Sequence, residues 1–385
     1  MIRGTDPAVV REALSTREPL PGTAGFAGAL DGTLVRDVLG RQPVFVETVS
    51  GADASHLAWS FDPEELVDPT LLPAGHTVSL DPAAGDLGGA DDGPNPAVAE
   101  PLVDRAESVW TLPSRPAADY DESVAAVETA VLESVREVDA EGLAVAFSGG
   151  VDSALVAAGV PEAPCYVVGF PGCHDVAAAE AAADAMDREV RVVELTHEAL
   201  KRAVPEVVAA TGRQNPMDVN IVLPLYLLAE QVAADGYDRL AVGQGADELF
   251  GGYAKVADAP DDPRVEAGTV RGATREVIGT LAEQLPRDVL ALRHAGVEPV
   301  APLLHDRVVD AALDLPGEAL VSGDTRKVAL RAAGEGVLPA SVVGADKKAV
   351  QYGSYVSREL DRLARQAGYK RRMENHVGQY IQSLL

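Results

Sequence analysis

Two glycine-rich segments, SGGVDS at residues 148–153 and GQGADE at residues 243–248, carry the residue types best suited to chemistry in this chain. Each follows a short apolar run that predicts a buried strand, residues 143–147 before the first and 240–242 before the second. Glycines let the backbone adopt positive φ and approach a ligand closely, and the N–H groups of a helix start favour an anion. The order of strand, glycine turn and helix therefore predicts a phosphate-binding loop.

The first loop differs from the common mononucleotide loop GxxxxGK[ST], which needs a lysine to reach the phosphates. No lysine lies near it, and Asp152 stands among the expected phosphate-binding groups. A bare carboxylate there would repel phosphate, whereas a Mg²⁺ between Asp152 and a pyrophosphate would bind both. The alternative is an ordinary serine–glycine turn between a strand and a helix.

The composition limits the classes of partner. The 385 residues carry a net charge of −28, with 26 arginines but only six lysines. Nucleic acids and anionic membranes would repel such a chain, which favours small-molecule partners. The same acidic charge predicts a halophilic protein of a salt-rich cytoplasm. Two cysteines form neither a disulfide scaffold nor a zinc site. We expect a cytoplasmic protein, because the longest apolar run, residues 221–229, is shorter than the roughly 20 residues that span a bilayer.

The elements around the loops predict two domains. Residues 1–117 read as short strands and turns, a small β-rich domain that ends in a linker rich in Gly, Pro and Asp. Residues 118–385 begin with a helix and then alternate between strands and helices, which predicts an α/β fold with a parallel sheet covered on both faces and a helical C-terminal part. The expected strands are 143–147, 165–170, 190–195 and 239–243; the expected helices are 121–139, 152–160, 175–187, 219–235, 271–285, 305–313, 324–334 and 356–368.

The sequence GADELFGGY at residues 245–253, together with SGGVDS, resembles the synthetase domain of the asparagine synthetases and the related β-lactam synthetases. Both belong to the ATP pyrophosphatase superfamily, whose fold is Rossmann-like. Further similar segments follow in the same order at residues 167–186, 294–316 and 338–353. The resemblance implies an AMP-forming ligase that uses ATP and Mg²⁺ to convert a carboxylate into an amide through an acyl-adenylate, with aspartate to asparagine as the leading case.

The resemblance also implies roles for individual residues. Asp152 and Asp247 would hold the metal and act in catalysis with Lys347, which would contact the α-phosphate, and Gln244 would contact the substrate. The remaining implied residues bind ATP: Ser148, Gly149, Gly150, Asp152 and Ser153 hold pyrophosphate, and Ala146, Val168, Gly169, Val242 and Gly243 hold adenosine.

Three features depart from the family pattern. Gln244 stands where asparagine synthetases have a glutamate, and Val300 replaces an arginine. Residues 1–117 resemble a truncated glutaminase domain, yet residue 2 is Ile2 and no cysteine precedes Cys165, so the nucleophile is missing. We therefore expect ammonia or an amine to come free or from a separate glutaminase. An amide ligase for a different carboxylate or amine, and a non-catalytic nucleotide-binding regulator, remain alternatives.

Overall fold

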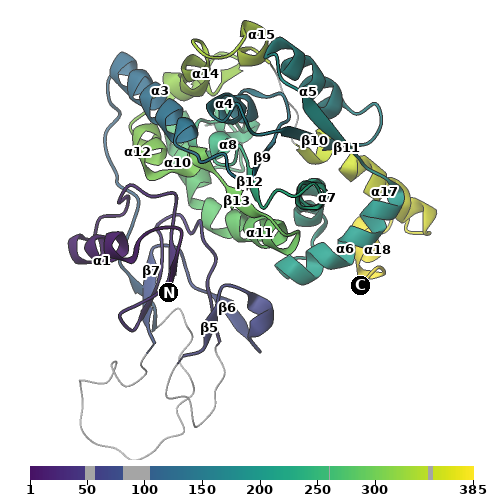
Figure 1. Ribbon diagram of the computed structural model, residues 1–385, viewed down its shortest axis with the longest axis horizontal. Helices are drawn as coiled ribbons and strands as arrows, with labels where there is room; N and C mark the ends of the chain where they lie inside the picture. Colours follow the sequence, from purple (N-terminus) through teal and green to yellow (C-terminus); the bar gives the residue numbers. More distant parts are fainter. Residues whose placement is uncertain (48–56, 81–104, 260, 346–349) are drawn as a thin grey trace, which may run out of the picture.

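The computed structural model describes residues 1–47, 57–80, 105–259, 261–345 and 350–385. Figure 1 shows a small unit of strands, drawn in purple, beside a larger α/β body that contains α11 and the parallel sheet. The N-terminus lies in the small unit, and the C-terminus lies beyond α18 at the far side of the larger body.

The N-terminal unit consists of two small antiparallel sheets, with the orders β1-β2-β3-β7-β8 and β5-β4-β6. Apolar side chains such as Leu34, Val46 and Leu72 are buried between them. This confirms the β-rich character predicted for the N-terminal region. The elements of this unit are β1 (Ile2–Arg3), α1 (Pro7–Thr16), β2 (Ala27–Leu30), β3 (Thr33–Arg36), β4 (Phe45–Glu47), β5 (Trp59–Ser60), η1 (Pro63–Glu65), β6 (Pro69–Leu71), β7 (His76–Ser79) and β8 (Glu107–Ser108).

The larger body is built on a five-stranded sheet with the order β11-β10-β9-β12-β13, and all four pairings are parallel. The predicted parallel α/β fold is therefore confirmed. The sequence pattern did not predict β13, which contains Pro299 and lies at the sheet edge, the position where a strand tolerates proline. The strands are β9 (Leu143–Ala146), β10 (Cys165–Gly169), β11 (Val190–Glu194), β12 (Arg239–Ala241) and β13 (Glu298–Val300).

Alternate residues of β9 supply the two faces of this sheet. Leu143 and Val145 join one apolar core, and Ala144 joins the other. The first core contains residues of α3, α4, α12 and α14, and the second contains residues of α6, α7, α17 and α18, which lie on opposite sides of the sheet in Figure 1. The helices that flank the strands are α3 (Tyr120–Arg136), α4 (Val151–Gly159), α5 (His174–Ala185), α6 (His197–Thr211), α7 (Pro216–Ala234), α12 (Asp306–Leu313), α14 (Val328–Gly334), α17 (Val356–Gln366) and α18 (His376–Gln382).

Helix α7 is long and apolar enough to cross a membrane by length and composition, but 61% of its most apolar window is buried inside the protein. It packs against α6, α11 and β10 and so serves as a core helix. It begins at Pro216, before the predicted start, because the Asn215 side chain accepts a hydrogen bond from the Asp218 N–H and caps it.

Beyond the first glycine loop, the sequence pattern did not predict α6. The helix expected at 271–285 is two helices, α10 and α11, that meet at Thr280. The helix expected at 324–334 begins only at Val328, because residues 325 and 326 form the strand β15. The remaining elements are α8 (Ala246–Leu249), α9 (Ala254–Ala257), α10 (Val270–Gly279), α11 (Leu281–His294), η3 (Pro302–Leu304), α13 (Gly317–Leu320), β14 (Val321–Ser322), β15 (Thr325–Arg326), α15 (Ala340–Val343) and α16 (Val350–Gly353).

Candidate functional site

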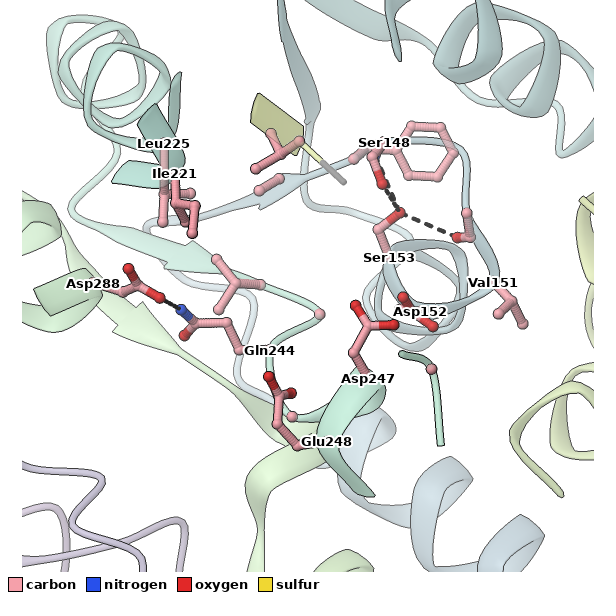
Figure 2. A pocket seen from close by; sticks show the side chains of 18 of the residues that line it. Ser148, Val151, Asp152, Ser153, Ile221, Leu225, Gln244, Asp247, Glu248 and Asp288 are labelled. Carbon is pink, nitrogen blue, oxygen red and sulfur yellow. Dashed lines mark hydrogen bonds between the residues drawn. The ribbon is translucent and has the colours of Figure 1, made fainter. Parts of the chain in front are cut away.

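The two glycine-rich loops lie side by side at the carboxyl ends of β9 and β12, which are neighbouring parallel strands. Between them and the surrounding helices is a cavity of about 460 Å³ (Figure 2). A Cβ added to Gly243 would lie 3.0 Å from the Asp152 Cβ and 3.2 Å from the Ser153 backbone nitrogen. A side chain at this position would be crowded by the first loop, so the two segments lie against each other and form one site, as parallel strand ends predict.

Hydrogen bonds of its own serines fix the conformation of the loop at 148–153. The Ser153 hydroxyl accepts the Ser148 N–H at 3.1 Å, lies 3.1 Å from the Ser148 hydroxyl and donates to the Gly150 carbonyl (Figure 2). Gly149 has a φ of 75°, which turns the chain into α4. No side chain caps the start of α4 at Gly150, so its N-terminal N–H groups are available for an anion.

The second loop turns at Gly245, whose φ is 89° and which begins the short helix α8. This turn presents Asp247 toward Asp152 and places Glu248 deeper in the cavity wall (Figure 2). Burial raises the pKa of the Glu248 carboxyl, which accepts a hydrogen bond from the Tyr253 hydroxyl at 2.5 Å. The loop therefore supplies one partly exposed and one buried carboxyl group.

Lys327 lies between the two aspartates, and sequence reasoning did not identify it. Its ammonium nitrogen is 2.7 Å from Asp152 Oδ2 and 2.8 Å from Asp247 Oδ1. Burial alone would lower the pKa of Lys327, but the two carboxylates raise it above its ordinary value. The rarity of lysine in this chain was the available signal. The converging carboxylates surround a cation position, as a divalent metal would require, and the second oxygen of Asp152 is buried without a partner.

The residues expected to hold adenosine occupy one wall of the cavity. Ala146, Val168, Val242 and Gly243 line it, and Ile221 and Leu225 of α7 lie across from the aspartates (Figure 2). Ser148, Gly150 and Ser153 also line the cavity, while Gly149 and Gly169 do not. Gly169 instead packs against the Cys173 sulfur, where an added Cβ would come within 2.3 Å.

Gln244 points away from Asp152 and Asp247 toward α11. Its amide nitrogen donates to Asp288 Oδ2 at 2.5 Å (Figure 2). Arg287 donates to both oxygens of Asp288 and, at 2.7 Å, to Asp218. The sequence pattern pointed to Gln244 but not to Arg287 and Asp288, which are a charged pair among the otherwise apolar buried residues of α11.

Lys347 lies outside the described residues. The residues on either side of that segment, Ala345 and Val350, both line the cavity. Arg331 of α14 donates hydrogen bonds to the carbonyls of Val343 and Ala345 and so holds the chain that leads into the segment. Val300, which the sequence analysis noted as a departure, pairs with Ala241 in the sheet.

Comparisons with known proteins cover this same region. The sequence matches the family model described as asparagine synthase over residues 126–290 and 269–377. It is 28% identical over 285 residues to a putative glutamine-hydrolyzing asparagine synthetase 1 of Methanocaldococcus jannaschii, covering 65% of this chain and 52% of that protein. It is 25% identical over 224 residues to asparagine synthetase B of Escherichia coli, covering 53% of this chain and 40% of that protein. The chain therefore spans about half the length of these relatives.

A solved structure of NMN synthetase from Francisella tularensis aligns with 69% of this chain and 93% of its own, at 13% identity and a TM-score of 0.30. The family match includes both glycine-rich loops and α11, and it extends over more than half of the sequence. The chain thus belongs to the asparagine synthase family.

Proposed function

We propose that this protein is an AMP-forming ligase that joins an amine to a carboxylate at the expense of ATP. A carboxylate oxygen of the acceptor attacks the α-phosphorus of ATP and displaces pyrophosphate, giving an acyl-adenylate. Ammonia or an amine then attacks the acyl carbon, loses a proton and displaces AMP. The observation that carries the proposal is the convergence of Asp152 and Asp247, each from a glycine loop at a strand end, on one cation position inside a cavity.

The site suits Mg²⁺-bound ATP in its charges and shape. Asp152 and Asp247 would hold Mg²⁺, which when bound neutralises phosphate charge, with further ligands from phosphate and water. The N–H groups at the start of α4 face the same end of the cavity and would bind pyrophosphate oxygens. Adenosine would lie against the wall formed by Ala146, Val168 and Val242.

Lys327 and Lys347 would stabilise the phosphoryl charge that develops during adenylation. With Mg²⁺ held by Asp152 and Asp247, Lys327 would no longer be needed to neutralise the two carboxylates and would supply a positive charge for a phosphate oxygen. In the family resemblance, Lys347 contacts the α-phosphate, and the position of Ala345 and Val350 in the cavity wall supports that assignment.

Aspartate is the leading acceptor, because the relatives matched are asparagine synthetases. A second candidate, an acceptor without a second carboxylate, is favoured by the Arg287 contacts. Its guanidinium is already shared between Asp288 and Asp218, so a second substrate carboxylate would compete with two protein carboxylates for it. Gln244, bonded to Asp288, adds a neutral amide beside this pair.

The test is pyrophosphate release from Mg²⁺·ATP with purified protein, ammonium and a panel of acids. The panel pairs each diacid with its matched monoacid, for example aspartate with β-alanine. We expect release that depends on an acid, and loss of at least about 100-fold in Asp152→Asn and Asp247→Asn, as for other lost transition-state contacts. Asp31→Asn, an exposed ion-pair variant far from the cavity, is the matched control. Acid-independent ATP turnover, or activity that survives in both site variants, would contradict the proposal.

A further inference from the structure

Two buried arginines of the N-terminal unit reach into the α/β body. Arg36 lies at the end of β3, and Arg41 follows it in the next turn. Both are almost completely buried, at 1% and 4% exposure. Burying a guanidinium is costly unless carboxylates or carbonyls compensate for the lost water, so the partners of these arginines show which groups join the two parts of the chain.

Arg41 is bound by carboxylates from both sides. It bonds to Asp37 of its own unit at 2.9 Å and to Asp306, the first residue of α12, at 2.7 Å. Asp306 in turn accepts hydrogen bonds from the Thr23 N–H and hydroxyl. Gly25 leaves the space for the guanidinium, because a Cβ there would lie 2.7 Å from Arg41 Nε. The network is fully buried and joins the two parts of the protein.

One further contact of Arg41 leads to the nucleotide loop. Its Nη1 donates to the Leu304 carbonyl at 2.7 Å. The Leu304 side chain lies directly beneath Gly245, where an added Cβ would come within 2.4 Å of Leu304 Cδ2. Gly245 is the turn that begins α8 and presents Asp247. A continuous chain of contacts therefore runs from Arg41 through Leu304 and Gly245 to Asp247.

Arg36 makes a parallel connection to the opposite wall of the cavity. Its guanidinium donates to the Ala282 carbonyl at 3.1 Å and to three carbonyls of its own unit. Ala282 is in the first turn of α11, the helix that carries Asp288 and its bond to Gln244. At the other end of α11, Arg293 donates to the Gln42 side chain at 2.6 Å. The N-terminal unit thus contacts both ends of α11.

We propose that Arg41 is a positioning residue for the metal-binding turn, so that the N-terminal unit, which has no cysteine nucleophile, serves the nucleotide site by fixing Asp247 in place. The inference rests on the proposed Mg²⁺·ATP binding and goes beyond it, since neither glycine loop belongs to the N-terminal unit. A purely structural role for Arg41 predicts lower stability but unchanged use of Mg²⁺ by the folded protein. The positioning role predicts weaker binding of Mg²⁺·ATP, with binding of Mg²⁺-free ATP unaffected.

The experiment measures ATP binding to the full chain by calorimetry, with Mg²⁺ and with EDTA. Arg41→Lys keeps a cation between Asp37 and Asp306 but cannot reproduce the fork that also reaches Leu304. Leu304→Ala removes the support under Gly245 from the other side, and Leu303→Ala, equally buried on the same short helix, is its matched control. We expect Arg41→Lys and Leu304→Ala to weaken Mg²⁺·ATP binding roughly tenfold, the value of about one hydrogen bond to a charged group, and raised Mg²⁺ to restore it.

The possible outcomes separate the two proposals. If the wild type does not bind Mg²⁺·ATP, the proposed function fails and this inference fails with it. If the wild type binds and Arg41→Lys, folded by its circular dichroism, binds equally well, only the positioning role is wrong. If Arg41→Lys does not fold, the two leucine variants decide: weaker binding in Leu304→Ala alone supports the role, and equal binding in both overturns it.

Discussion

Replacing Lys327 by methionine should make the free protein dependent on a divalent cation. The substitution keeps an unbranched side chain that is one atom shorter and removes the charge that lies 2.7 Å from Asp152 and 2.8 Å from Asp247. Two carboxylates would then face each other at the bottom of the cavity without the ammonium. A cation that binds both should restore what the lysine supplied, because Mg²⁺ prefers carboxylate oxygens.

The expected loss follows from the burial of each partner. Removing one partner of a buried ion pair costs about 3–5 kcal/mol. The side chains of Lys327 and Asp152 are only 11% and 13% exposed, so their contact is little screened by water. The Asp247 side chain is 47% exposed, so water weakens its attraction to Lys327. We therefore expect the lower end of that range, about 3 kcal/mol of unfolding free energy.

Urea unfolding of the wild type and Lys327→Met, with Mg²⁺ and with EDTA, measures this loss of unfolding free energy. Mg²⁺ at a hundred times its Kd should return about 2.7 kcal/mol to the variant and much less to the wild type, where the ammonium competes for the same oxygens. Lys201→Met, an exposed lysine of α6, is the control and should change little in either buffer. Equal stability of Lys327→Met and wild type in EDTA, or equal stabilisation of both by Mg²⁺, would refute the shared cation position.

Three further predictions concern the loop, the acid limit and the nitrogen donor. Gly149→Ala should destabilise the protein by more than about 1 kcal/mol and weaken ATP binding, because φ is 75° and the new Cβ would lie 2.5 Å from the Ala178 carbonyl oxygen. Thermal melts and ATP titrations measure both effects. Gly172→Ala, at φ 70° in open space, is the control. Hydrogen bonds from Arg371 and His376 lower the pKa of Asp361. The contribution of Asp361 to folding stability is therefore present above the ordinary pKa of about 3.9 and is lost as pH falls below it. Asp361→Asn should flatten the acid side of a plot of stability against pH, and an unchanged slope would contradict this. The chain's two cysteines are both buried in the α/β body, so ammonium should support amide formation where glutamine alone does not, and glutamate release from glutamine by the pure protein would show otherwise.

The sequence alone determined the frame of the site. Short apolar runs before SGGVDS and GQGADE predicted strands, and the alternation of strands with helices predicted a parallel sheet, because both patterns depend on residues close together in the chain. Parallel strands place their carboxyl ends at one edge, so the meeting of Asp152 and Asp247 also followed from order alone. The structure confirms the sheet and brings the two loops within van der Waals contact at Gly243.

Only the tertiary structure decided which other charges share the cavity. Lys327 is 175 residues from Asp152 in the sequence. No local periodicity connects a lysine before a short helix with the loop that follows the central strand of the sheet. The sequence pattern did not single out Arg287 and Asp288, and only their burial places the pair against Gln244. The link from Arg41 to the α/β body gave no local signal either, since its partners there are residues 304 and 306. The period of apolar residues shows which face of a helix or strand is buried. Which charged side chain lies opposite that face depends on how distant elements pack, and the local sequence pattern does not contain that packing.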